Sequence, residues 1–255
     1  MWVSYSMNKE DIWVAHVPVP VKTVATAHAD DDFAQYQKLG DLKTWNIYSP
    51  LMAPVSLRQE WLELKDEDPF DYACVERKIP ASSYLKAAFD VQAAQTRNGS
   101  LQIEFLDEKG IACTRIELNN EGMIRVKNGA RYGNVMPYQA DQTYRFEATL
   151  DTQHRQLNLT VSTLDVEGKA LQSKSTKRIF YAPVHQIERI RFRTGDLRTF
   201  PTIDTPADWF GTLEHAGDTD TTALYRIAHV KTASMDADAG SAVLKTADYK
   251  HYVDD

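Results

Sequence analysis

The feature that most constrains the fold is a run of alternating apolar and polar residues between positions 100 and 162. Five short stretches keep a period of two, and turn sequences such as Glu108-Lys109-Gly110 and Asn128-Gly129 separate them. This pattern predicts an antiparallel β-meander with one buried face and one solvated face. Its apolar members are Leu101, Ile103, Phe105, Ile116, Leu118, Ile124, Val126, Tyr144, Phe146, Ala148, Leu150, Leu157, Leu159 and Val161.

Strand-like segments continue on both sides of the meander. The candidates are residues 45–49, 55–57, 61–65, 72–79, 84–93, 177–180, 186–194 and 224–232. Ten or more strands without a long helix predict an all-β protein, an antiparallel two-sheet jelly-roll sandwich. Pairing of an early strand with the last strand is typical of jelly rolls, because it closes the edges of the sheets.

The pattern changes along the chain suggest four segments. Residues 1–21 hold two strand-like runs that end in Pro18-Val19-Pro20, which predicts a short N-terminal β-hairpin. A lone hairpin is marginal in water, so it must lean on the main domain or on another sheet. Residues 22–44 have little periodicity and are interpreted as a linker, residues 45–232 as the sandwich and residues 233–255 as a flexible tail.

Composition excludes several classes of protein. The formal net charge of −7 argues against a nucleic-acid-binding protein, which normally carries a basic stripe. No apolar run is long enough to predict a membrane span, and the first residues do not read as a signal peptide. The chain's two cysteines, Cys74 and Cys113, are too few for a disulfide framework and are expected to be unpaired thiols.

The polar residues of the strands form a set of mixed charge. One interpretation is a solvated ladder of ion pairs, each worth about 0.2–1 kcal/mol between neighbouring strands. The other is a polar sheet face that binds sugar hydroxyls through Glu and Arg side chains held on rigid strands. The set comprises Gln102, Glu104, Arg115, Glu117, Arg125, Lys127, Arg145, Glu147, Thr149, Asn158 and Thr160.

Three arginines in line on one strand extend this set. Arg189, Arg191 and Arg193 alternate with Ile190 and Phe192, so they share the side opposite the core. Three guanidinium groups in a row repel one another unless acidic groups lie across them. Neighbouring carboxylates are one solution, and a uronate or sulfate ligand is another, because arginine binds such anions with two hydrogen bonds.

Aromatic side chains supply candidate platforms for sugar rings. Most aromatic residues of a sandwich belong to its core. Trp209, in a polar loop, and Tyr132, beside Gly133 in an expected turn, are the best candidates for exposed platforms, because loops at the ends of a sandwich often carry function. The predicted carbohydrate-binding residues are therefore Arg115, Arg125, Tyr132, Arg189, Arg191, Arg193 and Trp209.

No signature of catalysis or of cofactor binding is present. The chain lacks a nucleophile elbow, a phosphate-binding loop and a zinc-protease motif. Glu60 and Glu63 are an odd number of residues apart, so on a regular strand they point to opposite faces, which disfavours a glycosidase pair. An enzyme would instead need an Arg/Tyr/His constellation. The candidates for it are Arg115, Arg191, Tyr132 and His185.

No cofactor is predicted, and two acidic segments are the candidates for a metal. Calcium often binds irregular acidic loops, and residues 195–221 form such a loop, although its spacing is not that of an EF-hand. The run from His28 to Asp32 is the second candidate, although such runs are usually solvated. The loop aspartates are Asp196, Asp204, Asp208, Asp218 and Asp220.

Two parts of the chain resemble known families. Residues 1–20 (MWVSYSMNKEDIWVAHVPVP) resemble the end of the last blade of sialidase-like, BNR-type β-propeller proteins from polysaccharide-degrading bacteria. Residues 45–232 resemble the concanavalin-A-like (laminin-G-like) sandwich that follows such propellers. The motifs that carry this second resemblance are residues 99–110 (GSLQIEFLDEKG), 121–129 (EGMIRVKNG) and 187–195 (IERIRFRTG).

The resemblance implies the C-terminal piece of an extracellular or periplasmic polysaccharide-active protein, with an upstream propeller domain as its partner. The catalytic residues of such a propeller are not in this sequence. We therefore expect a non-catalytic carbohydrate-binding or accessory module, with an acidic plant or algal polysaccharide as one ligand class. A stand-alone sandwich glycoside hydrolase or polysaccharide lyase, and a structural module that packs on a propeller, are the alternatives.

Overall fold

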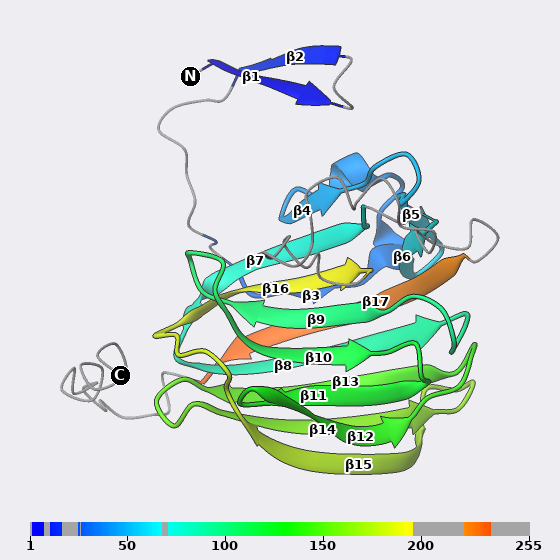
Figure 1. The fold of residues 1–255 in the computed structure, drawn as a ribbon, viewed down its shortest axis with the longest axis vertical. Coiled ribbons are helices and arrows are strands. Elements are labelled where there is room, and N and C mark those ends of the chain that lie inside the picture. The colour runs from blue at the N-terminus through cyan, green and yellow to red at the C-terminus, as the bar shows by residue number, and fades with distance from the viewer. Residues whose placement is uncertain are drawn as a thin grey trace, which may run out of the picture.

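The computed structural model describes residues 2–7, 11–16, 25, 27–67, 71–195 and 222–235. Strands dominate these residues and form the two antiparallel sheets of a sandwich, as the sequence predicts (Figure 1). The seven-stranded sheet has the order β12 (Arg131–Pro137), β11 (Met123–Asn128), β10 (Ala112–Leu118), β9 (Leu101–Leu106), β16 (Ile187–Thr194), β7 (Cys74–Ser82) and β4 (Trp45–Tyr48).

The second sheet closes the fold with the last strand in its interior. Its order is β15 (Ala170–Ile179), β14 (Gln156–Leu164), β13 (Thr143–Asp151), β8 (Tyr84–Ala93), β17 (Ala223–Ser234), β6 (Trp61–Asp66) and β5 (Val55–Arg58), and β3 (Asp30–Asp31) pairs with β17 as its eighth strand. The late strand β17 thus pairs with the early strand β6, which is the closure expected of a jelly roll.

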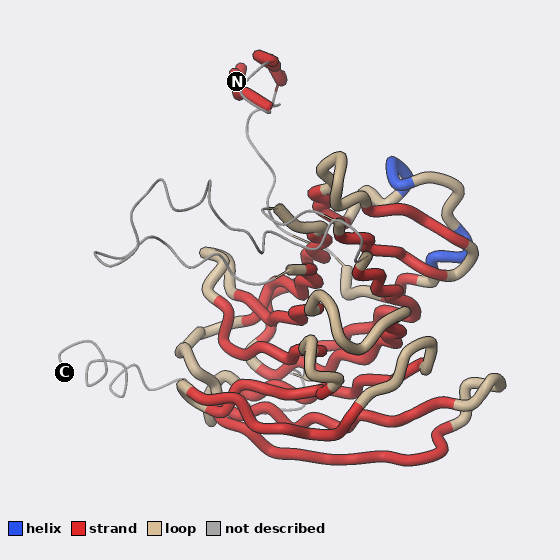
Figure 2. Tube along the Cα trace, turned by 45° about the vertical axis from the view of Figure 1, so that its right-hand side comes forward, coloured by secondary structure: helices blue, strands red, loops and turns tan. Residues whose placement is uncertain are grey.

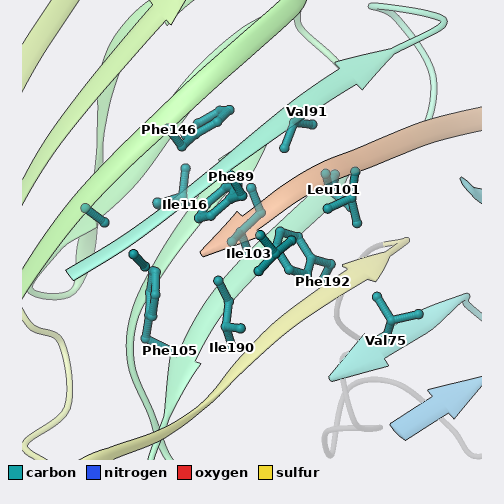
Figure 3. Packing of buried hydrophobic residues seen from close by; sticks show 14 of the residues in the cluster. Val75, Phe89, Val91, Leu101, Ile103, Phe105, Ile116, Phe146, Ile190 and Phe192 are labelled. Atoms are coloured by element: carbon teal, nitrogen blue, oxygen red, sulfur yellow. The ribbon is translucent and has the colours of Figure 1, made fainter. Parts of the chain in front are cut away.

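Apolar side chains from both sheets meet in one core. Ile103, Ile124 and Phe146 are fully buried, so the alternation predicted from the sequence does separate an apolar inside from a polar outside. Phe89 on β8 stacks on Phe146 at a centroid distance of 5.3 Å and meets Phe192 of the opposite sheet edge-on at 5.2 Å (Figure 3). The contact between Phe89 and Phe192 joins the two sheets.

The predicted meander is divided between the two sheets. Strands β9, β10, β11 and β12 belong to the seven-stranded sheet, whereas β13, β14 and β15 belong to the eight-stranded sheet. The polar residues that the sequence groups into one set therefore lie on two outer faces. Gln102 to Lys127 share one outer face with the three arginines of β16, and Arg145 to Thr160 lie on the other.

Residues 27–44 pack on the sandwich, in place of the linker that their weak periodicity predicts. Asp31 accepts hydrogen bonds from Arg77 at 2.7 Å and from the Trp45 indole at 3.1 Å, and all three side chains are buried. Phe33, at the start of the 3₁₀ turn Phe33–Gln35, is fully buried, and a second 3₁₀ turn covers Leu39–Asp41 (Figure 2). Contacts with residues distant in the sequence hold this segment in place, and such contacts leave no periodic pattern in the segment itself.

The predicted N-terminal hairpin is present, with β1 (Trp2–Met7) paired antiparallel to β2 (Asp11–His16). Trp2, Ile12 and Val14 are all more than half exposed on it. The predicted tail lies outside the described residues beyond residue 235, as do residues 196–221, which contain Trp209 and the five loop aspartates.

Candidate functional site

The outer face of the seven-stranded sheet carries the largest group of sequence-predicted site residues. Alternate residues of its strands point away from the core, because neighbouring side chains on a strand point to opposite faces. The register places Arg115 and Arg191 on either side of Glu104, and Arg193 beside Gln102. We call this surface the charged face; it comprises Glu76, Gln102, Glu104, Arg115, Glu117, Arg125, Lys127, Tyr132, Arg189, Arg191 and Arg193.

Most arginines of the charged face are neutralised by carboxylates on the next strand. Glu104 is fully buried, and it accepts hydrogen bonds from Arg115 at 2.7 Å and from Arg191 at 2.8 Å. Arg125 is bound to Glu117 in the same way. The attraction of these carboxylates raises the pKa of Arg125 and opposes the desolvation of Arg115 and Arg191, so all three stay charged. This part of the face is a ladder of ion pairs.

Arg189, at the end of strand β16 farther from Arg193, is also engaged. Its guanidinium lies 3.3 Å from a carboxylate oxygen of Glu76 and donates to the carbonyl of Glu108. Four of the five predicted arginines therefore have protein partners. They shape the face and fix its charge pattern, but their strongest hydrogen-bonding directions are already used.

Arg193 differs from the other four arginines. Its guanidinium carbon lies 3.7 Å from the centre of the Tyr72 ring, which is a cation–π contact, and within the described residues it has no carboxylate partner. Its neighbour across the sheet is Gln102, which is 3% exposed and whose side-chain oxygen has no hydrogen-bond partner in the described part of the chain. A cation and an unused amide oxygen thus meet at one end of the charged face.

Tyr132 lies in strand β12, and the predicted turn at this position is wrong. The strand was missed because its residues alternate poorly: only Met136 is buried among the seven. The Tyr132 ring is 4.4 Å from the guanidinium carbon of Arg125 and 4.5 Å from the ammonium nitrogen of Lys127. These cations occupy ring surface that the sequence analysis assigned to a sugar, and they anchor the far end of the ion-pair ladder.

Tyr72 was not among the predicted site residues, and Gln102 was named only as one of the polar residues of the sheet face. Tyr72 stands among many aromatic residues of the sequence, and nothing local marks it as the partner of Arg193. Tyr72 comes close to Arg193 because β16 pairs with β7, in which Cys74, two residues after Tyr72, lies opposite Arg193. Only the register between strands far apart in the sequence provides that information.

The predicted Arg/Tyr/His constellation for catalysis is not favoured by the electrostatics. Arg115 and Arg191 are both bound to Glu104, and His185 is exposed on the connection before β16, where its carbonyl accepts a hydrogen bond from Thr152. Burial raises the pKa of Tyr132, whereas a tyrosine that acts as a general base needs a lowered pKa.

The carboxylates of the His28–Asp32 run have other partners. Asp31 binds Arg77, Asp30 forms an ion pair with Lys231, and Asp32 caps the 3₁₀ turn through the amide of Ala34. Across the described ranges, no group of three or more His, Cys, Asp or Glu residues is placed to hold a metal ion. The aspartates proposed for calcium lie outside those ranges.

Several thiol and phenol groups are buried in their protonated form, which predicts that the stability of the protein falls at alkaline pH. Both cysteines are free, and burial raises the pKa of Cys74 from 9.0 to about 11. The unfolded chain therefore releases this proton first, so the stability linked to the protonated thiol is complete below pH 9 and is lost as the pH rises towards 11. Burial also raises the pKa of Tyr138 and of Tyr181 to about 12.

We expect the melting temperature to fall by several degrees between pH 9 and pH 11, measured by circular dichroism. The fall should be smaller in the Cys74→Ser variant, because serine does not titrate in this range. An equal fall in the variant and in the unchanged protein would contradict the assignment to Cys74.

None of the helices among the described residues is long and apolar enough to cross a membrane.

Comparisons with known proteins agree with this architecture. The family model described as "Sialidase-like, CBM domain" matches residues 45–209. A solved structure named "Sialidase" is 56% identical to this chain, covers 99% of it and superposes with a TM-score of 0.78. The chain spans only 22% of the length of that protein. No curated protein sequence matches the chain.

More distant solved structures share the fold. One, from work on endo-acting O-glycanases of human gut bacteria, is 13% identical over 80% of this chain and 97% of its own length, with a TM-score of 0.54. Another is a GH131 beta-glucanase catalytic domain from Podospora anserina, 12% identical over 79% of this chain and 93% of its own, with a TM-score of 0.52. At such low identity the likeness extends to the fold alone.

Proposed function

Because the chain belongs to the family of sialidase-like CBM domains, we propose that it is the non-catalytic carbohydrate-binding module of a larger sialidase-type protein and that its ligand is an acidic glycan. The chain's share of the similar sialidase, about a fifth of that protein's length, supports the idea of a module. An extracellular or periplasmic location follows from this role, because that is where long glycans are met.

The N-terminal hairpin supports an upstream β-propeller as the physical partner. Trp2, Ile12 and Val14 are exposed on a two-stranded sheet, and such a sheet is marginal on its own in water. Further strands of a propeller blade would cover these apolar side chains. We propose that residues 1–21 complete the last blade and that the sandwich is carried behind it.

The single observation that carries the proposed ligand class is the uncompensated charge of Arg193. A guanidinium held over the Tyr72 ring, with no carboxylate partner among the described residues, keeps N–H groups available for a ligand carboxylate. Gln102 adds an amide beside it. In this proposal Arg115, Arg125, Arg189 and Arg191 contribute positive charge to the same face, Tyr132 anchors its far end, and Trp209, which lies outside the described residues, stays a predicted platform.

We expect the Arg193→Ala variant to bind polygalacturonate about 10- to 100-fold more weakly, because one charge-assisted contact is lost. Affinity electrophoresis measures this, with fully methyl-esterified polygalacturonate as the uncharged probe. The matched control is Arg131→Ala, an exposed arginine on the edge strand β12 of the same sheet, which should bind like the unchanged protein. The pair 3′-sialyllactose and lactose tests the same contact on a short ligand.

The alternatives give different results in the same experiment. New reducing ends or an ultraviolet-absorbing product would support a hydrolase or a lyase. Absence of retardation by every polymer would support a structural module. Equal loss of binding in the Arg131 and Arg193 variants would mean that general positive charge, and not the Arg193–Tyr72 site, attracts the ligand.

A further inference from the structure

The outer face of the eight-stranded sheet, opposite the charged face, is hollowed. Two adjoining depressions of about 460 and 520 Å³ share Glu147 and Thr149 as lining residues. We call them together the outer groove. The lining includes Glu147, Thr149, Asn158, Thr160, Ser175 and Lys177 in the first depression, and Asp30, Lys86, Ala88 and Lys231 in the second.

The floor of the groove contains short side chains at three positions of one register row across the sheet. Along one row, Ala88 lies between Lys231 of β17 and Glu147 of β13, and Thr160 and Ser175 continue the row on β14 and β15. The short side chains of Ala88, Thr160 and Ser175 leave the floor low. Five strands spaced about 4.8 Å apart give a length of roughly 19 Å, enough for a short oligosaccharide.

Four exposed polar side chains of the outer groove are not used by the rest of the described protein. Lys86, Glu147, Asn158 and Lys177 are exposed, and in the part of the chain that the structure describes none of their side chains forms an ion pair or a hydrogen bond. Other lining groups are paired: Lys231 with Asp30, Thr160 with Ser175, and the Thr232 hydroxyl with the amide of Ala29. The charged face shows the reverse, since most of its charges are bound to one another.

We propose that the outer groove binds an uncharged glycan chain that runs across the strands from β17 to β15. A sugar hydroxyl both donates and accepts a hydrogen bond, and the groove offers ammonium donors, a carboxylate acceptor and an amide that does both. Glu147 is shared by both depressions and so stands at the middle of the groove. The lysines and carboxylates of the lining, Lys86, Lys177 and Lys231 with Asp30 and Glu147, nearly balance, so an anionic chain gains little here. At Arg193, by contrast, a guanidinium has no carboxylate partner among the described residues.

The groove is open and its assigned lining contains no aromatic side chain, so the expected affinity is low. Hydrogen bonds exposed to water contribute about 1 kcal/mol each, so four to six of them, reduced by the cost of association, give millimolar or weaker binding. A polymer with many repeats is therefore the right probe.

The test is affinity electrophoresis of the whole chain in gels that contain neutral glucan, xylan, mannan or galactan. We expect at least one of these to retard the protein and Ala88→Trp to abolish the retardation, because the indole fills the floor of the groove. Ala170→Trp is the matched control: it places the same side chain at an exposed position of β15 outside the lining and should leave retardation unchanged. Asn158→Ala should weaken it about threefold to tenfold through loss of one or two hydrogen bonds.

The two proposed sites are distinguished by their variants. Arg193→Ala should leave binding to the neutral polymer unchanged, and Ala88→Trp should leave binding to polygalacturonate unchanged. Failure of every neutral polymer to retard the protein, or retardation that survives both Ala88→Trp and Asn158→Ala in folded protein, would overturn the outer-groove site. The acidic site would stand in either case, because its own probe and variant report it separately.

Discussion

Replacement of Glu104 by alanine should destabilise the protein by about 3–5 kcal/mol, because the change leaves two partly buried guanidinium groups without their shared carboxylate. Glu104 is fully buried, and Arg115 and Arg191 are 12% and 27% exposed at their side chains. The loss is larger than that of an exposed ion pair because the two cations cannot recover full hydration. Urea denaturation monitored by tryptophan fluorescence measures the free energy of unfolding.

The matched control for Glu104 is Glu147→Ala, at an exposed mid-strand position of the other sheet. It should change the free energy of unfolding by less than about 0.5 kcal/mol, because Glu147 has no ion pair in the described residues. Replacement of Arg115 and Arg191 by methionine in the Glu104→Leu background should recover part of the stability, since well-packed apolar groups can substitute for a buried ionic cluster. If the Glu104→Ala and Glu147→Ala variants had equal free energies of unfolding, the ion pairs of the charged face would not be a stabilising element.

The second large effect is expected for Asp31→Ala. Arg77 is 5% exposed at its side chain and pairs with Asp31, so removal of the carboxylate leaves a buried charge, at a cost of about 3–5 kcal/mol. The indole of Trp45 loses its acceptor as well. For a chain of this size the melting temperature should fall by about 10 °C, which differential scanning calorimetry would show.

The adjacent residue gives a close control for Asp31. Asp30 pairs with Lys231, but the two side chains are 81% and 63% exposed, so Asp30→Ala should cost no more than about 1 kcal/mol. If the Asp31→Ala and Asp30→Ala variants had the same melting temperature, residues 27–44 would contribute little to the stability of the sandwich. The interpretation of this segment as a linker would then be supported. The difference between neighbouring aspartates thus tests whether this segment belongs to the folded domain.

The limits of sequence reasoning are clearest at the arginines of β16. The alternation of Arg189, Arg191 and Arg193 with Ile190 and Phe192 predicts that all three lie on one face, where acidic neighbours or an acidic ligand must balance them. It could not separate Arg191, which Glu104 neutralises, from Arg193, which lies on Tyr72. That distinction depends on which residues β9 and β7 bring alongside β16.

By itself the sequence determined the strands with strong alternation, the side of each strand that faces the core, and hence the all-β sandwich. These are local properties, because the direction of a side chain on a strand follows from the two-residue period of the backbone. Only the tertiary structure decided that the predicted meander is split between two sheets, that residues 27–44 are packed through Asp31 and Phe33, and that the polar residues form two different surfaces. Those outcomes depend on register between strands distant in the sequence, and no local pattern encodes a distant partner.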